Sequence, residues 1–169
     1  MLRIFVSSTF NDMHVERDCL EDVQQDLNAQ FLEAGEKIEF IDLRWGICTE
    51  ELDEEARNKE VLEGCFSAIE KSDYLLVFLG NRYGSLKSYN EVLGYLGKKK
   101  TDILFKESSV GKSITELEVT YAQLVKGFDS NNTIVCIRDE LEVEEKAQKF
   151  ISNFASNKAY EKSILRYTN

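Results

Sequence analysis

The sequence lacks the residues that several common chemistries require. Its single histidine, His14, lies in the polar start of a predicted helix without a nearby nucleophile signature, which disfavours hydrolysis by a catalytic triad. The 4 cysteines, Cys19, Cys48, Cys65 and Cys136, are widely separated and form no CxxC or Cys/His pair. Such spacing indicates neither a zinc site nor a disulfide framework. We therefore expect buried, reduced thiols and no metal site.

Long apolar runs and an excess of basic residues are also missing. No apolar stretch approaches the ~20 residues that cross a bilayer, and the opening run LRIFVSS is not a signal peptide. The formal net charge of -10 argues against DNA or RNA as the main partner, because phosphate neutralisation supplies most of that affinity. We expect a soluble, cytoplasmic protein with no direct nucleic-acid or membrane partner.

Two nucleotide-binding motifs are absent as well. No Walker loop or GxGxxG follows the first predicted strand, and the Gly111-Lys112-Ser113 triplet lacks the upstream glycine at the required spacing. These absences exclude a P-loop NTPase and an ordinary dinucleotide dehydrogenase.

What is present is an alternation of strand-like and helix-like segments. Four short apolar or β-branched runs are each followed by polar residues and then by helical periodicity, at residues 2–8, 38–43, 74–79 and 133–137. The helical segments include a third at about residues 113–125 and a fourth at about 143–154. Nearly continuous apolar strands are typical of a parallel sheet covered on both faces, and right-handed crossovers make it doubly wound. Residues 163–167 read as a fifth strand.

The size and composition predict a single domain over residues 1–169, with 43% hydrophobic and 31% charged residues. Residues 85–112 form a long connection, which we interpret as an inserted loop or lid. Because no helix follows the strand at 163–167, we expect the chain to be the N-terminal part of a longer multidomain protein.

Ligands of doubly wound sheets bind beyond the carboxyl ends of the strands, near the point where strand order reverses. The loops after Ser8, Leu43 and Gly80 are therefore candidate binding segments. The first of these could hold a phosphate at the start of a helix. The same residues could instead cap that helix through Ser8, Thr9 or Asn11, and the two interpretations are compatible.

Two carboxylates follow on the third predicted helix. Ser113 and Glu116 have the spacing of a capping box, which gives Glu116 a structural role. Glu118 borders the apolar stripe close to the carboxyl edge of the sheet. It could stabilise the positive charge that develops when an N-glycosidic bond breaks, or it could be an exposed salt-bridge residue.

Several segments together resemble one family, the TIR-like domain found ahead of NACHT-type NTPase modules in bacterial defence proteins and in animal proteins such as telomerase-associated protein and nephrocystin. The segments occur in family order: Ile4-Phe5-Val6-Ser7-Ser8-Thr9-Phe10, Asp12-Met13, Glu16-Arg17-Asp18, Asp42-Leu43-Arg44-Trp45-Gly46-Ile47, Gly80-Asn81-Arg82-Tyr83-Gly84 and Thr115-Glu116-Leu117-Glu118.

The resemblance implies a flavodoxin-like domain that assembles with copies of itself in immune or antiphage signalling, beside NTPase or sensor modules of the same chain. Related domains cleave NAD+ at the nicotinamide N-glycosidic bond in a composite pocket. NAD+ is then the substrate, and no other cofactor is required. The position that matches their catalytic glutamate is Glu118, with Glu116 as the fallback. The implied ligand-binding residues are Ser7, Ser8, Thr9, Phe10, Arg44, Trp45, Arg82 and Tyr83.

Other interpretations stay open. The aromatic-Cys pair that precedes the glutamate in many TIR domains is replaced here by Thr115-Glu116. The domain could be a non-catalytic module for homotypic interaction, docking through an acidic loop at residues 49–58. It could also be an enzyme like the nucleoside deoxyribosyltransferases. The segment Thr115-x-x-Glu118-x-x-x-Ala122 resembles the helix that carries the catalytic glutamate in those enzymes. Arg17, Arg44 and Arg82 could pair with aspartates and fix the loops.

Overall fold

The computed structural model describes residues 1–9, 12–43, 54–106 and 111–138. The elements in chain order are β1 (Leu2–Ser7), α1 (His14–Gln30), η1 (Leu32–Ala34), β2 (Ile38–Ile41), α2 (Glu54–Glu70), β3 (Tyr74–Leu79), β4 (Leu86–Lys87), α3 (Tyr89–Leu104), β5 (Lys112–Ser113), α4 (Ile114–Tyr121), η3 (Ala122–Lys126) and β6 (Thr133–Ile137).

The fold is α/β, with a parallel four-stranded sheet in the order β2-β1-β3-β6. The register aligns Phe5 of β1 with Ile41 of β2 and with Leu75 of β3. The four predicted strands and their parallel arrangement are therefore confirmed, and the architecture is that of a flavodoxin-like domain. Chain order reverses at β1, because β2 lies on one side of it and β3 on the other.

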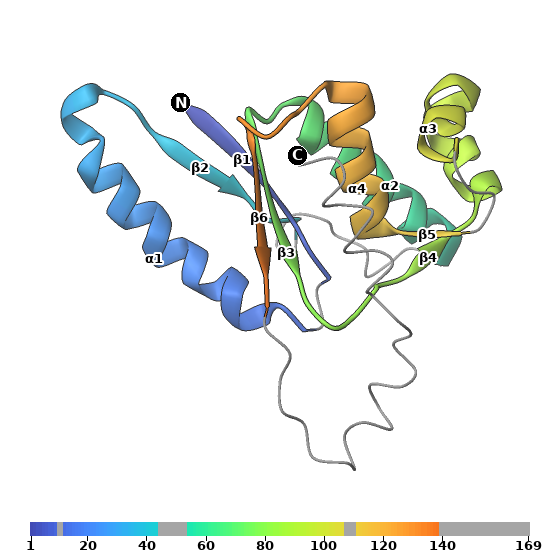
Figure 1. Cartoon of the computed structure of the whole chain (residues 1–169), viewed down its shortest axis with the longest axis horizontal. Coiled ribbons are helices and arrows are strands. Elements are labelled where there is room, and N and C mark those ends of the chain that lie inside the picture. Colours follow the sequence, from blue (N-terminus) through green and yellow to red (C-terminus); the bar gives the residue numbers. More distant parts are fainter. Residues whose placement is uncertain (10–11, 44–53, 107–110, 139–169) are drawn as a thin grey trace, which may run out of the picture.

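Helices cover the two faces of the sheet unequally (Figure 1). Successive strand residues point to opposite faces, so Val6 and Leu76 pack with Leu20 of α1 in a small cluster. Phe5 and Leu75 point the other way, into the main core under α2 and α4. Each Å² of apolar area buried in these clusters stabilises the fold by roughly 25 cal/mol. The cluster under α2 and α4 is the larger one, so that face of the sheet gains more stability from burial.

Residues 85–112 carry structure that the sequence analysis did not predict. Strands β4 and β5 pair antiparallel, and between them lies α3, which contacts α2 and α4. Ser88 caps α3 in a complete capping box with Glu91. Gly97, with φ of 72° and ψ of 164°, interrupts the helix with a kink at a conformation that glycine adopts at little cost.

Some predictions need correction or lie outside the described residues. Cys19 and Cys136 are exposed, and only Cys65 is buried among the described cysteines. The cap of α1 falls at Met13, without a side-chain hydrogen bond, so the predicted capping by Ser8 or Thr9 is wrong. His14 is exposed, as expected. The predicted helix at 143–154 and strand at 163–167 lie outside the described residues.

In the part of the chain that the structure describes, no helix combines the length and the apolar character needed to cross a membrane.

Candidate functional site

The carboxyl end of β1 places consecutive serines on opposite faces of the sheet. Ser7 and Ser8 are 0% and 5% exposed. Ser7 shares a face with Phe5 and points toward α4, where its hydroxyl meets Glu118. Ser8 points toward α1, where its hydroxyl accepts a hydrogen bond from Arg17 Nε at 2.7 Å. The strand thus ends in two polar clusters at the point where strand order reverses.

Glu118 is buried beneath this edge, with 5% of its surface exposed. The Ser7 hydroxyl donates to its Oε2 at 2.5 Å, and the buried Cys65 thiol of α2 is close enough to influence the pKa of the same carboxylate. Burial raises the pKa of Glu118, while the hydrogen bonds from Cys65 and Ser7 and the nearby charge of Arg17 lower it. Desolvation prevails, so the site holds a carboxyl group with an elevated pKa. The exposed salt-bridge interpretation of Glu118 is wrong.

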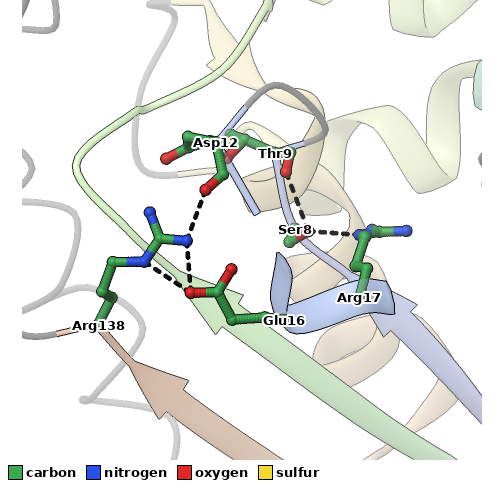
Figure 2. Close-up of polar contacts among 6 residues, drawn as sticks. All are labelled: Ser8, Thr9, Asp12, Glu16, Arg17 and Arg138. Carbon is green, nitrogen blue, oxygen red and sulfur yellow. Dashed lines mark hydrogen bonds and ion pairs between the residues drawn. The ribbon is translucent and has the colours of Figure 1, made fainter. Parts of the chain in front are cut away.

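Across the sheet, Arg17 is the centre of a structural cluster. Its guanidinium is ion-paired with Asp42 and donates to the Val6 carbonyl at 3.1 Å as well as to Ser8. Figure 2 shows Arg17 reaching Ser8 from α1. The predicted pairing of Arg17 with an aspartate is confirmed. Because Asp42 follows β2, this side chain joins the ends of two neighbouring strands to α1.

A second arginine ties the end of β6 to the start of α1. Arg138 pairs with Glu16 and donates to the Asp12 carbonyl at 2.6 Å (Figure 2). The hydrogen bond from Arg138 lowers the pKa of Glu16. Thr9 bonds to the Asp12 carboxylate. These contacts fix the segment that leads from β1 into α1.

The loop after β3 meets the start of α4. The Tyr83 hydroxyl donates to Glu116, and burial followed by this hydrogen bond raises the pKa of Tyr83. Glu116 also pairs with Lys112 at 3.2 Å. The Ser113 hydroxyl accepts from the Glu116 amide at 3.1 Å, as the capping box predicts, but the Glu116 carboxylate is engaged by Tyr83 and Lys112.

The loops after β1 and β3 touch each other. A Cβ placed on Gly80 would lie 2.2 Å from Met13 Cε and 2.9 Å from Asp12 Oδ2, and one on Gly84 would lie 3.0 Å from Thr9 Cγ2. Met13 is only 1% exposed. The loops after β1 and β3 are therefore packed against each other, at the edge of the sheet where Ser7 meets Glu118.

The structure brings some of the predicted site residues together and separates others. Ser7 meets Glu118, and Tyr83 meets Glu116. Ser8 turns away to the α1 face. Thr9 and the half-buried Arg82 lie in the loops at the same edge. Phe10, Arg44 and Trp45 lie outside the described residues, as do residues 49–53 of the predicted acidic loop. Residues 54–58 form the start of α2, so that part of the loop prediction is wrong.

Sequence reasoning missed Cys65 as a partner of Glu118 and Arg138 as a partner of Glu16. Cys65 sits on the apolar stripe of α2 and reads there as an ordinary core residue. Arg138 directly follows β6, so its position at the carboxyl edge of the sheet was a usable signal.

Fold and site together define a doubly wound α/β domain with a buried glutamate at the carboxyl edge of its sheet. Residues 3–167 match DUF4062, a family described as a domain of unknown function. The chain belongs to this family.

Relatives of known name are much longer proteins. The chain is 37% identical over 119 residues to telomerase protein component 1 of Mus musculus and 36% identical over 119 residues to that of Rattus norvegicus. These matches cover 70% of the chain and 4% of each relative. A TPR repeat-containing protein of Dictyostelium discoideum is 27% identical over 163 residues, which are 92% of the chain and 10% of that protein. No solved structure matches the chain.

Proposed function

We propose that the chain is a TIR-like effector domain that cleaves NAD+ at the nicotinamide N-glycosidic bond when copies assemble, in immune or antiphage signalling. The observation that supports this most is Glu118, a buried carboxylate at the reversal point of the sheet. Among the described residues, it accepts a hydrogen bond from the neutral Ser7 hydroxyl, and the neutral Cys65 thiol lies beside it. Burying such a group costs free energy, and a chain that only needed packing would be more stable with an apolar residue there.

The chemistry suits the substrate class. The nicotinamide ring of NAD+ carries a positive charge, which would stabilise the ionised carboxylate and lower its pKa on binding. As the bond between ribose C1′ and the ring nitrogen breaks, its electron pair goes to nicotinamide, and positive charge develops on the ribose. Glu118 would stabilise that charge. Water then adds at C1′ and releases a proton, leaving ADP-ribose.

Access to Glu118 requires the contact between the loops after β1 and β3 to open. We assign the open form to the assembled state, in which copies of the domain associate with one another. The share of the relatives that the chain covers, 4% to 10%, supports the proposal that the domain is one module of a longer protein, beside NTPase or sensor modules.

The packing of these loops against each other and the burial of Glu118 favour a second candidate, a non-catalytic module for homotypic interaction. In that case Glu118 would be a buried residue that substrate never reaches. A soluble nucleoside in place of NAD+ tests the third interpretation, a deoxyribosyltransferase-like activity, in the same assay.

The test is NAD+ consumption by the full chain fused to an oligomeric scaffold, with chromatography of nicotinamide and ADP-ribose products. Glu118→Gln should abolish turnover, and Glu116→Gln tests the fallback residue. Glu63→Gln, an exposed change on α2, is the matched control and should keep full activity. Turnover that survives in Glu118→Gln would overturn the catalytic role. Absence of turnover in an assembled wild-type protein would favour the interaction module.

A further inference from the structure

Two side chains from separate elements, a hydroxyl and a thiol, lie beside the Glu118 carboxylate. Ser7 ends β1 and is 0% exposed, and its hydroxyl lies 2.5 Å from Glu118 Oε2. Cys65 lies on α2, is 1% exposed, and is close enough to the same carboxylate to lower its pKa. Glu118 itself belongs to α4. The strand β1 and the helices α2 and α4 therefore meet at the Glu118 carboxylate.

The surrounding core fixes these three elements relative to one another. Phe5 of β1, Leu62 of α2 and Leu117 of α4 all belong to the main hydrophobic cluster, and Leu62 and Leu117 are 0% exposed. Side chains in such a core keep one rotamer. The two donors consequently approach the carboxylate from directions that the fold sets, which limits rotation of the carboxylate about its last bond.

We infer that Ser7 and Cys65 are positioning residues that orient the Glu118 carboxylate and stabilise its ionised form for the cleavage step. This inference rests on the proposed function, and it changes the role of Ser7. The resemblance to TIR-like domains implied that Ser7 binds the ligand, whereas its hydroxyl is already directed at Glu118.

If Cys65 had a purely structural role, its ability to donate a hydrogen bond would not matter. A small buried thiol packs like an apolar residue, so alanine or valine would serve there equally well. A donor matters only if the neighbouring group is an acceptor that must keep its charge. The Arg17 charge also acts on Glu118 from the opposite side of β1, so Cys65 and Ser7 supply the direct contacts while Arg17 supplies a more distant charge.

Infrared spectroscopy can test the thiol contact without any enzymatic activity. The S–H stretching band of the Cys65 thiol, identified by its loss in Cys65→Ser, should shift to higher frequency in Glu118→Gln, because an amide oxygen accepts more weakly than a carboxylate. Cys19→Ser removes an exposed thiol and is the control for band assignment. A Cys65 band that Glu118→Gln leaves unchanged would overturn the inference.

Kinetics on the assembled protein supply the second readout. Cys65→Ala and Ser7→Ala should each lower kcat about 10- to 100-fold with KM nearly unchanged, the range expected when a hydrogen bond to a charged group is lost. The acidic limb of the pH profile should move to higher pH, because a donor that favours the ionised form is gone. Cys65→Ser keeps a donor and should recover most of the rate.

A packing control separates positioning from loss of core volume. Ile69→Val removes one methyl group from α2, and Ile69 is 0% exposed. It should lower stability without moving the pH profile. A profile shift in Ile69→Val equal to that in Cys65→Ala would show that packing alone is responsible and would overturn the positioning role. If wild-type protein shows no turnover, the proposed function fails, and the infrared result still decides whether Cys65 holds Glu118.

Discussion

The two faces of the sheet differ in how the buried charged residue on each of them is compensated. On the α1 face, the guanidinium of Arg17 is 1% exposed and is satisfied by an aspartate, a hydroxyl and a backbone carbonyl. On the α2/α4 face, the hydrogen bond to Glu118 comes from the neutral Ser7 hydroxyl, and the neutral Cys65 thiol lies beside the carboxylate. The first arrangement offsets the cost of burying a charge. The second costs stability, and this difference directs the search for function to Glu118.

Removing Arg17 should have the largest effect. Arg17→Met breaks the buried ion pair with Asp42, and breaking such a pair costs about 3–5 kcal/mol. Urea unfolding of the full chain would measure the loss. The matched control is Arg3→Met, which breaks an exposed pair with Glu39 at 3.3 Å and should cost less than about 1 kcal/mol. Equal losses in the two variants would show that the Arg17 cluster is no more structural than a surface pair.

Tightening the contact between the loops after β1 and β3 should have an intermediate effect. In Gly80→Ala the new methyl group would overlap Met13 Cε at 2.2 Å. Because this atom is the end of a flexible side chain that can shift, we expect a loss of about 1 kcal/mol, the lower end of the range for overpacking. Gly94→Ala on α3 is the control, because nothing lies within 4 Å of its added Cβ. That helical substitution should be neutral or stabilising by up to about 1 kcal/mol. Thermal unfolding compares the two variants. A Gly80→Ala protein as stable as wild type would mean that the loops already yield easily.

Hydrophobic periodicity carried most of the fold prediction. The runs that became β1, β2, β3 and β6 are apolar and bounded by polar residues, so their pattern is local. Helix α3 was missed because Gly94, Gly97 and the lysines at 98–100 obscure its periodicity. The signal that could have found it is the capping box of Ser88 and Glu91, which is equally local.

The site was only partly predictable, because its contacts are not local. Glu118 was identified from its place on the helix and from the family resemblance. Its burial depends on Ser7, which is 111 residues away in sequence, and on Cys65, which looks like any core residue. Arg17 gave a better signal, since a charged residue near the start of an amphipathic helix and an aspartate after the next strand can meet at the same edge of the sheet.

Neutralising Glu118 should have the smallest effect on stability, and the effect should have the opposite sign. Because burial raises the pKa of Glu118 in the folded protein, folding favours the protonated form. Its contribution to stability is fully present below the pKa of the unfolded chain and is lost as pH rises through the folded pKa. Because glutamine does not ionise, Glu118→Gln does not lose stability in this way as pH rises. The variant should therefore gain stability relative to wild type as pH rises from about 4, the unfolded range, toward neutrality.

The measurement is the urea midpoint of the full chain across that pH range, for wild type and Glu118→Gln. Glu91→Gln is the control with the contrary sign, because hydrogen bonds from the Ser88 backbone and side chain lower the pKa of Glu91, so its charged form favours folding and its loss should cost stability as pH rises. If instead the stability of Glu118→Gln relative to wild type falls between pH 4 and neutral pH, then the ionised Glu118 side chain stabilises the fold. Glu118 would then be a structural charge, like Arg17. A more stable but inactive Glu118→Gln would instead separate function from stability at this residue.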